Sequence, residues 1–216
     1  MRAVITGATG GIGGATAEAL GRAGYEVIIT GIDLEAGKKV IDKLESQGIK
    51  VHFYACDATN EEQVNETFAK IGEEFGSLDL LVNNVGGLGG RQRVSEMETG
   101  FMRKVMALNF DSVFFNTRAA LPLLKKGKDA SIVNFSTIAV TSGAGIRANM
   151  VSPGTIDTAF HAATDRALVE SWKDSILMKR LGDPREVADV IVFLASEKAS
   201  FITGEVIQIN GGQAFI

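Results

Sequence analysis

The chain has 216 residues, 45% of them hydrophobic and 22% charged, with a formal net charge of −4. This composition is ordinary for a soluble globular protein, and the acidic balance excludes the basic face that nucleic-acid binding needs. No apolar run approaches the ~20 residues of a membrane span, and the single cysteine, Cys56, excludes an internal disulfide. The first residues enter a strand pattern directly, without the features of a signal peptide. We therefore expect a cytoplasmic protein with neither a nucleic-acid nor a membrane partner.

Seven short runs rich in Val and Ile predict β-strands, with helical patterns between them. Their centres are continuously apolar, as expected for strands covered on both faces. The runs span residues 3–6, 27–30, 51–56, 79–83, 131–136, 146–151 and 205–209. Alternation of this kind predicts the α/β class, with a doubly wound parallel sheet and helices on both faces. Neither a linker nor an internal repeat interrupts the pattern, so we expect a single domain over residues 1–216.

Two of the predicted helices have clear beginnings. One begins near Thr59–Asn60, and its apolar stripe consists of Val64, Phe68, Ile71 and Phe75. The other begins at residues 183–186, Asp-Pro-Arg-Glu, which combine an N-cap residue, a proline in the first turn and a glutamate three residues after the cap.

A glycine-rich turn, TGATGGIG at residues 6–13, directly follows the first strand run. Gly7, Gly11 and Gly13 would let the backbone turn tightly and approach a pyrophosphate, with the N-terminus of the next helix facing its negative charge. Glycines also serve plain tight turns. The position of this one, between the first strand and the first helix of an alternating chain, predicts dinucleotide binding.

Further motifs follow in order along the chain. They are CDAT (56–59), NNVG (83–86), Asn109 within MALNFDSVFFN, Ser136 at the end of SIVNFS, VSPGTIDT (151–158) and TGEVIQINGG (203–212). With the glycine turn, this ordered set resembles the short-chain dehydrogenase/reductase family over essentially the whole chain. The resemblance implies a Rossmann-type domain of about seven parallel strands that interconverts a carbonyl and a secondary alcohol with NAD or NADP. It also implies a small-molecule substrate, as in 3-oxoacyl reductases or small alcohol and sugar dehydrogenases.

The same resemblance implies roles for individual residues. The cofactor-binding set comprises Gly7, Thr9, Gly11, Ile12 and Gly13 at the pyrophosphate turn, Asp33 near the ribose, Asp57 and Ala58 at the adenine, Asn84, Val85 and Gly86 beside the adenosine ribose, and Pro153, Gly154, Ile156 and Thr158 at the nicotinamide end. Ser136 would hold the substrate oxygen, and Asn109 would support a water-linked proton path. A homotetramer or homodimer is also implied, with the helical region 101–124 contributing to an interface.

Three of these residues also fit from position alone. Asp57, Asn84 and Ser136 each stand just past the carboxyl end of a predicted strand, where an open parallel sheet binds its ligands. Each has a simpler alternative, since Asp57 can begin a turn and Ser136 can cap a strand.

The choice between NAD and NADP depends on the end of the second strand run. Gly31 and Ile32 stand where the family's members often carry an acidic residue for NAD or an arginine for NADP, and Gly10 brings no basic group either. Asp33 can reach the ribose, and its charge would repel a 2′-phosphate. Alternatively, Asp33 is only the N-cap of the helix that follows. The balance favours NAD.

The connection between the fifth and sixth strand runs is too short for this fold. A parallel pair needs a crossover of about a dozen residues or more, usually with a helix. Residues 7–26 and 31–50 supply twenty each, whereas only nine residues, 137–145, separate Ser136 from Ile146. Nine residues can span the distance, since they reach about 30 Å when extended, but they would leave one face of the sheet without its helix.

The family resemblance locates the same defect. Members carry a Tyr-x-x-x-Lys motif on this crossover helix, where the lysine lowers the pKa of the tyrosine so that it serves as general acid and base. This sequence has only Tyr25 and Tyr54, and neither is followed by a lysine at that spacing. Either a segment near residues 142–146 is omitted from the printed sequence, or the chain is a non-catalytic dinucleotide-binding protein. The intact remainder of the motif set favours an omitted segment.

Other candidates are weaker. His161 lies in the region where the family builds a mobile substrate lid; it can contact substrate or lie on an exposed loop. His52 and Cys56, four residues apart on one strand, would lie about 13 Å apart, too far to share a metal ion. No metal site is predicted.

Overall fold

A computed structural model describes residues 1–90, 94–135, 146–162 and 164–213 of the protein. Within these residues seven strands form one sheet: β1 (Arg2–Thr6), β2 (Glu26–Gly31), β3 (Val51–Ala55), β4 (Leu80–Asn83), β5 (Ser131–Phe135), β6 (Arg147–Pro153) and β7 (Val206–Ile209). The longer helices are α1 (Gly11–Arg22), α2 (Leu34–Glu45), α3 (Glu61–Phe75), α4 (Thr99–Met106), α5 (Ser112–Leu124), α6 (Arg166–Ser171) and α7 (Pro184–Ala195). Short helical turns are η1 (Val94–Glu96), η2 (Ala107–Asp111), η3 (Ala159–His161), η4 (Trp172–Ser175) and η5 (Glu197–Ala199).

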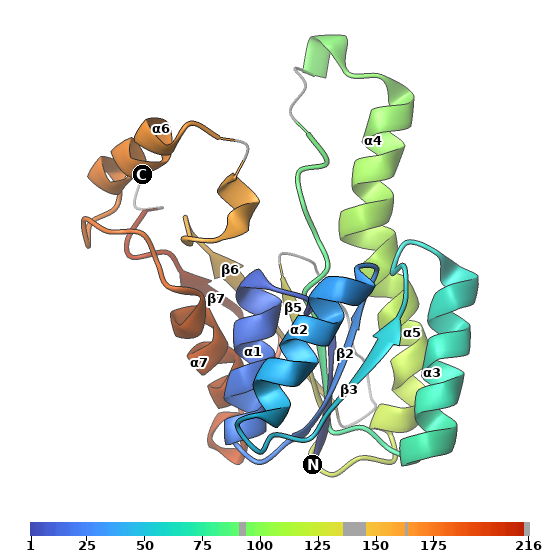
Figure 1. The fold of residues 1–216 in the computed structure, drawn as a ribbon. Helices are drawn as coiled ribbons and strands as arrows, with labels where there is room; N and C mark the ends of the chain where they lie inside the picture. The colour runs from blue at the N-terminus through green and yellow to red at the C-terminus, as the bar shows by residue number, and fades with distance from the viewer. Residues whose placement is uncertain (91–93, 136–145, 163, 214–216) are drawn as a thin grey trace.

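The strands lie in the order β3-β2-β1-β4-β5-β6-β7, and every neighbouring pair is parallel. The order reverses between β1 and β4, and an open α/β sheet binds its ligands outside the carboxyl ends of the strands at such a point. In Figure 1 these ends face upward, toward the segments around α4 and α6 that extend beyond the sheet. The predicted fold class, a Rossmann-type parallel sheet with helices on both faces, is confirmed.

Helices cover the two faces of the sheet with separate apolar clusters. On one face α1, α2 and α7 pack buried residues such as Leu20, Leu44 and Ile191 against the strands. On the other face α3 and α5 contribute Phe68 and Leu124. This arrangement explains the continuously apolar strand runs, because alternate residues of each strand enter different clusters.

Most predicted elements are confirmed, and their ends differ by one or two residues. Asn60 is the N-cap of α3 and accepts a hydrogen bond from the Gln63 amide, and Asp183 forms the predicted capping box at α7. Asp79 was expected to open the fourth strand but precedes it. Its carboxylate accepts hydrogen bonds from the amides of Arg2 and Lys128. Asp79 therefore links the start of β4 to the start of β1 and to the connection between α5 and β5.

β5 and β6 are parallel neighbours, paired from Ser131 with Arg147 to Phe135 with Val151. The eleven residues 136–146 connect them. On the face opposite α7, the start of β6 is covered, since Ala148 is buried in the cluster formed with α3 and α5, but the carboxyl end of β6 and the strand β7 are less covered. Met150 and Ser152 are half-buried there, and Val206 is 48% exposed.

Candidate functional site

The glycine turn between β1 and α1 leaves open space over the N-terminus of the helix. Gly7 and Gly11 have left-handed backbones, with φ of 64° and 55°, which glycine adopts without steric cost. A Cβ built on Gly10 or Gly11 would meet no heavy atom within 4 Å. Gly10 caps α1 without a side-chain hydrogen bond, and no acidic residue stands in the first turn. The first amides of α1 therefore remain free to bind an anion.

The other side of the turn is held by Asn84, directly after β4. Its Nδ2 donates to the carbonyl oxygens of Thr6 and Gly7, both at 3.0 Å, and its backbone amide donates to Thr6 Oγ1 at 3.1 Å. A Cβ on Gly13 would lie 2.6 Å from Asn84 Nδ2, and one on Gly7 would lie 2.9 Å from Val85 Cγ2. Gly7 and Gly13 thus allow close packing, whereas Gly10 and Gly11 leave the open space.

At the end of β2, Asp33 is the N-cap of α2 and accepts a hydrogen bond from the Ala36 amide at 3.0 Å. The N-cap alternative is therefore correct, while a contact of Asp33 with a ribose stays a prediction. A Cβ on Gly31 would lie 2.6 Å from Thr9 Cγ2. Thr9 fills the space that a side chain at residue 31 would need, and Ile32 is 76% exposed.

Asp57 follows β3 and begins a turn, which was the simpler alternative for this residue. Its Oδ1 accepts hydrogen bonds from the amide of Thr59 at 2.9 Å and from its hydroxyl at 2.7 Å. Ala58, the next residue, is 5% exposed. Their contact with an adenine stays a prediction.

Asn109 lies in η2, a π-helical turn between α4 and α5. Its Oδ1 accepts from the Gly87 amide at 2.9 Å, while Nδ2 donates to the carbonyl oxygens of Gly87 and Val105 at 2.8 and 2.9 Å. A Cβ on Gly86 would lie 3.0 Å from Asn109 Oδ1. The side chain therefore fixes the loop after β4 to the helix, and π-turns of this kind are frequent at functional sites.

Beyond β6 the chain makes an excursion whose described residues are 157–162 and 164–181, which we call the lid. Two backbone hydrogen bonds close its base: Asp157 donates to the Gly182 carbonyl at 2.9 Å, and Gly182 donates to the Thr155 carbonyl at 3.0 Å. Ile156, paired with Gly182 at this base, is 5% exposed.

The remaining residues predicted for the nicotinamide end lie beside this base. Pro153 ends β6, and the Gly154 amide donates to the Ile209 carbonyl at 3.0 Å. Thr158 caps η3 by accepting from the Phe160 amide at 3.3 Å.

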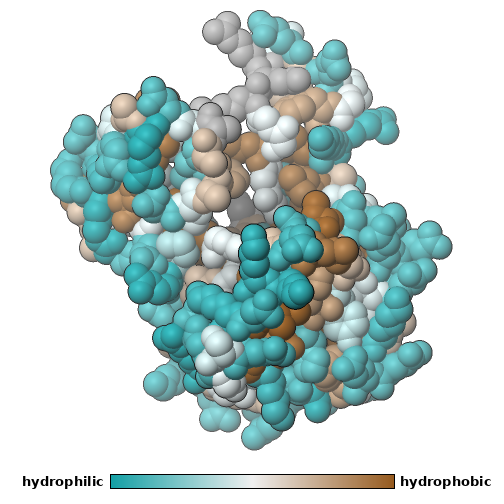
Figure 2. Space-filling model, in the orientation of Figure 1, coloured by the Kyte–Doolittle hydropathy of each residue, from teal (hydrophilic) through white to brown (hydrophobic). Residues whose placement is uncertain are grey.

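A cleft of about 630 Å³ separates the lid from the loop after β4. Its lining comprises Gly87, Leu88, Gly89, Gly90, Phe160, His161, Thr164 and Asp165. Figure 2 shows that the surface is hollowed between the lid and the segment around α4. His161 packs edge-on between the rings of Phe160 and Trp172, at 5.2 and 5.3 Å. The cleft is large enough for a small organic molecule.

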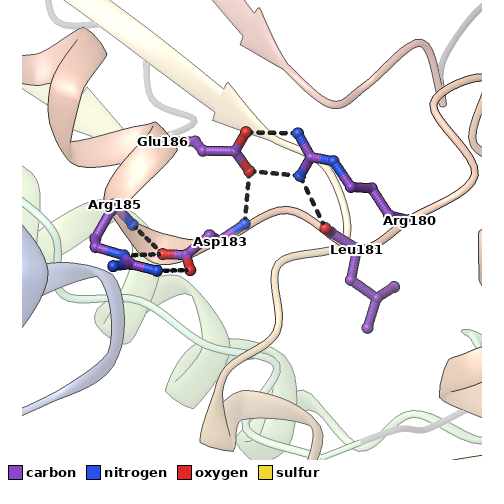
Figure 3. A network of polar contacts seen from close by, with 5 residues as sticks. All are labelled: Arg180, Leu181, Asp183, Arg185 and Glu186. Atoms are coloured by element: carbon purple, nitrogen blue, oxygen red, sulfur yellow. Dashed lines mark hydrogen bonds and ion pairs between the residues drawn. The ribbon is translucent and has the colours of Figure 1, made fainter.

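The exit of the lid is fixed by a network of ion pairs at the start of α7 (Figure 3). Arg180 donates twice to the Glu186 carboxylate, at 2.8 and 2.7 Å, and Glu186 also accepts from the Asp183 amide at 2.8 Å. These contacts hold the pKa of Glu186 at about 2. Arg185 binds the Asp183 carboxylate and lowers its pKa likewise to about 2. The capping box was predicted from the sequence, but the contribution of Arg180 was not.

Neither tyrosine of the chain is suited to proton transfer at this site. Tyr54 lies on β3 and donates its hydroxyl to Glu74, and partial burial together with that carboxylate raises its pKa to about 12. Burial also raises the pKa of Tyr25. This residue precedes β2 and therefore lies at the amino ends of the strands, away from the site. A general acid of this kind needs a lowered pKa.

Ser136 lies outside the described residues, so its predicted role stays a prediction. Among the residues the structure describes, no group of three or more His, Cys, Asp or Glu side chains is arranged to hold a metal ion. Within the same residues, no helix has the length and apolar character needed to cross a membrane.

Comparison with known proteins agrees with this arrangement. A sequence model described as short chain dehydrogenase matches residues 1–144, and one described as enoyl-(acyl carrier protein) reductase matches residues 137–214. The chain is 33% identical to the 3-oxoacyl-[acyl-carrier-protein] reductase FabG of Aquifex aeolicus, with 97% of this chain and 95% of the relative covered. It is 31% identical to a cyclohexanol dehydrogenase of Acinetobacter, with 97% and 93% covered.

Solved structures give the same result. A 7α-hydroxysteroid dehydrogenase complexed with NADH superposes with a TM-score of 0.88 at 26% identity, covering 98% of this chain and 93% of that one. The RhlG/NADP complex of Pseudomonas aeruginosa superposes with a TM-score of 0.87 at 28% identity, covering 98% and 95%.

The comparisons also bear on chain length and on the short connection after β5. The alignment with the Aquifex relative extends over 237 positions, so at least 21 of them have no counterpart among the 216 residues of this chain. The two family models meet at residues 137–144, within that connection. Since the first model alone matches two thirds of the sequence, the chain belongs to the short-chain dehydrogenase family of NAD(P)-dependent oxidoreductases.

Proposed function

We propose that the crevice above β1 and β4 binds NAD(H) and that the protein interconverts a carbonyl and a secondary alcohol in the neighbouring cleft. The observation that carries this proposal is the open turn at Gly10–Gly11 over the uncapped N-terminus of α1. A pyrophosphate fits there because the space is empty and the free amides and the helix dipole attract negative charge. When bound, the dinucleotide supplies or takes up hydride at C4 of its nicotinamide.

The residues of this chain would then bind and orient the reactants. The amides at Gly11, Ile12 and Gly13 would hold the pyrophosphate, supported from below by Asn84. Asp57 keeps its Oδ2 for the adenine end, since both turn contacts use Oδ1. Gly154 and Thr158 lie at the base of the lid, where the nicotinamide would sit.

The preference for NAD over NADP rests on Asp33. Its carboxylate lies at the start of α2, close to where a 2′-phosphate would be placed, and no basic residue stands at positions 31 or 32. Like charges at such distances repel.

For the substrate we propose a 3-oxoacyl compound or a small alcohol or sugar. Leu88 and Phe160 give the cleft an apolar lining, and they are 50% and 56% exposed. Ser136 would hold the substrate oxygen, and Asn109 would place the loop beside it.

The proton donor would come from a Tyr-x-x-x-Lys helix that the 216 residues do not contain. Three observations support an omitted crossover: the surplus of alignment positions, the overlap of the two family models at 137–144, and the partial exposure of Met150, Ser152 and Val206 on one face of β6 and β7. A helix on that face would cover Met150 and Ser152. The alternative is a non-catalytic dinucleotide-binding protein.

We also propose that this single-domain protein forms a homotetramer or homodimer in the cytoplasm. A stripe of exposed apolar side chains runs along α4, η2 and α5 at a spacing of four residues: Met102, Met106, Phe110 and Phe114. Exposed apolar stripes of this kind are typical of protein interfaces.

Two measurements test the proposal. Titration with NADH and NADPH, followed by nicotinamide fluorescence, should show saturable binding with NADH bound more tightly; no binding of either would contradict the proposed function. The intact mass of the protein shows whether a crossover segment is present in addition to the 216 residues. A mass about 2.5–3 kDa above 22.9 kDa would indicate the omitted segment of about 25–30 residues, and a mass near 22.9 kDa would support the non-catalytic alternative.

A further inference from the structure

The C-terminal motif INGG and the glutamine after it form a tight turn at the end of β7, residues 210–213, which we call the C-terminal turn. Gly211 and Gly212 both have left-handed backbones, with φ of 59° and 84°. The Gly212 amide donates to Asn210 Oδ1, and the Gln213 amide donates to the Asn210 carbonyl, both at 3.0 Å. The turn is therefore a rigid element defined by its own hydrogen bonds.

The side chain of Gln213 binds the segment that enters the lid. Its Oε1 accepts from the Thr155 amide at 2.9 Å and from the Thr155 hydroxyl at 3.0 Å, and its Nε2 donates to the same hydroxyl at 2.9 Å. A Cβ on Gly154 would lie 2.8 Å from Gln213 Oε1. Gly154 thus lets the glutamine approach the backbone closely.

The same turn also contacts the segment that leaves the lid. The Met178 amide donates to the Gly211 carbonyl at 3.1 Å, and a Cβ on Gly212 would lie 2.7 Å from Leu177 Cδ1. Thr155 meanwhile accepts from the Gly182 amide across the base of the lid. Entry and exit of the lid are therefore tied to each other and to one turn.

We propose that Gln213 is a positioning residue that holds the base of the lid in place beside the cleft by binding Thr155. Its amide satisfies a backbone donor and a hydroxyl at once, at a site 58 residues away in sequence. The link to catalysis rests on the proposed function, because Gly154 and Thr155 flank the predicted nicotinamide end. The latching of the lid itself is a property of the protein without cofactor.

The test compares cleavage of the lid by trypsin in the cofactor-free full-length protein. Lys173 is half-buried in η4, beside the apolar cluster of Trp172, Val169 and Ile176, so cleavage after it requires the lid to open. The variant Gln213→Leu loses all three hydrogen bonds to Thr155. We expect its cleavage after Lys173, followed by mass spectrometry, to accelerate about tenfold, which corresponds to about 1.4 kcal/mol.

Two further variants keep the test decisive. Gln213→Glu retains both acceptor contacts with Thr155 and should be cleaved at nearly the wild-type rate, even if Gln213→Leu fails to fold. Gln47→Leu is the matched control: it loses side-chain hydrogen bonds with Arg22 and Glu18 at an exposed site remote from the lid. Equal cleavage of wild type and Gln213→Leu, or equal acceleration in Gln213→Leu and either of the other variants, would overturn the proposal.

Spectroscopy separates this proposal from the proposed function. Trp172 is the only tryptophan of the chain and lies in the lid, so acrylamide quenching of its emission should increase in Gln213→Leu and not in Gln213→Glu. Failure of the wild type to bind NADH would contradict the proposed function alone. Unchanged quenching and proteolysis in Gln213→Leu would contradict the latch alone.

Discussion

Gly13 and Gly14 provide a matched pair of substitutions in the first turns of α1. A Cβ on Gly13 would lie 2.6 Å from Asn84 Nδ2 and 2.9 Å from both Ala8 Cα and the Gly7 carbonyl oxygen, whereas the nearest atom to a Cβ on Gly14 is 3.7 Å away. Two of the three atoms at Gly13 belong to the backbone, so they cannot rotate away. Both replacements by alanine gain the same helix propensity, and only Gly13→Ala adds a clash.

The difference between the two variants therefore isolates the steric cost. Overpacking of a well-packed site costs about 1–3 kcal/mol, so Gly13→Ala should be less stable than Gly14→Ala by that amount. For a chain of this length each 1 kcal/mol lowers the melting temperature by about 2–4 °C. The clash also displaces Asn84 from the carbonyls of Thr6 and Gly7, so the affinity for NADH should fall in Gly13→Ala alone.

Thermal and urea unfolding measure the stability difference, and fluorescence titration measures the affinity for NADH. Gly14→Ala serves as the control in both assays. Equal stabilities and equal NADH affinities in the two variants would refute the assignment of Gly13 to close packing against Asn84.

Three other predictions concern charge. The pKa of Tyr54 is raised to about 12, so its stabilising hydrogen bond to Glu74 is present below pH 10 and is lost as pH rises from 10 to 12. Wild type should therefore be more stable than Tyr54→Phe at about pH 8. In unfolding experiments, this difference in stability should vanish by about pH 12. The pKa of Glu186 is lowered to about 2, so the advantage of wild type over Glu186→Gln should be present above pH 4.5 and fade toward pH 2; because the pair with Arg180 is exposed and screened, we expect about 1 kcal/mol, and an advantage that does not decline in acid would contradict this assignment. Asp33→Asn keeps a good N-cap and removes the charge, so the ratio of NADPH to NADH affinity should rise without loss of stability; an unchanged ratio in binding titrations would show that Asp33 does not select the cofactor.

The sequence predicted the sheet well because its strands are covered on both faces. Their continuously apolar centres and the helical patterns between them depend only on local composition. The capping box at Asp183 was equally local, since Glu186 lies three residues away. These signals suffice for the fold class and for the edge of the sheet where Asp57 and Asn84 lie.

The contacts that shape the site are long-range, and no local pattern announces them. The place of Asn84 beside a ribose stays a prediction, and the hydrogen bonds of its side chain to the carbonyls of Thr6 and Gly7, 78 and 77 residues earlier, left no signal in the sequence. Gln213 gave no signal at all, because an isolated glutamine near a glycine pair is common on surface turns. Asp33 shows the opposite case. Its capping role was evident from the sequence, whereas its predicted effect on the choice of cofactor depends on a ligand outside the chain.

The π-turn at residues 107–111 gives the helical rod between α4 and α5 one residue more than a regular helix would have. A π-turn takes up the additional residue locally, so the helices on either side keep nearly the same faces toward their neighbours. α5 is anchored to the sheet through α3 and β4, and Asn109 within the turn binds Gly87. Deleting one residue here would restore a regular helix and move Asn109 from this position, so the loop lining the cleft would lose its support. The number of residues in this turn, as well as their type, therefore fixes the loop beside the cleft.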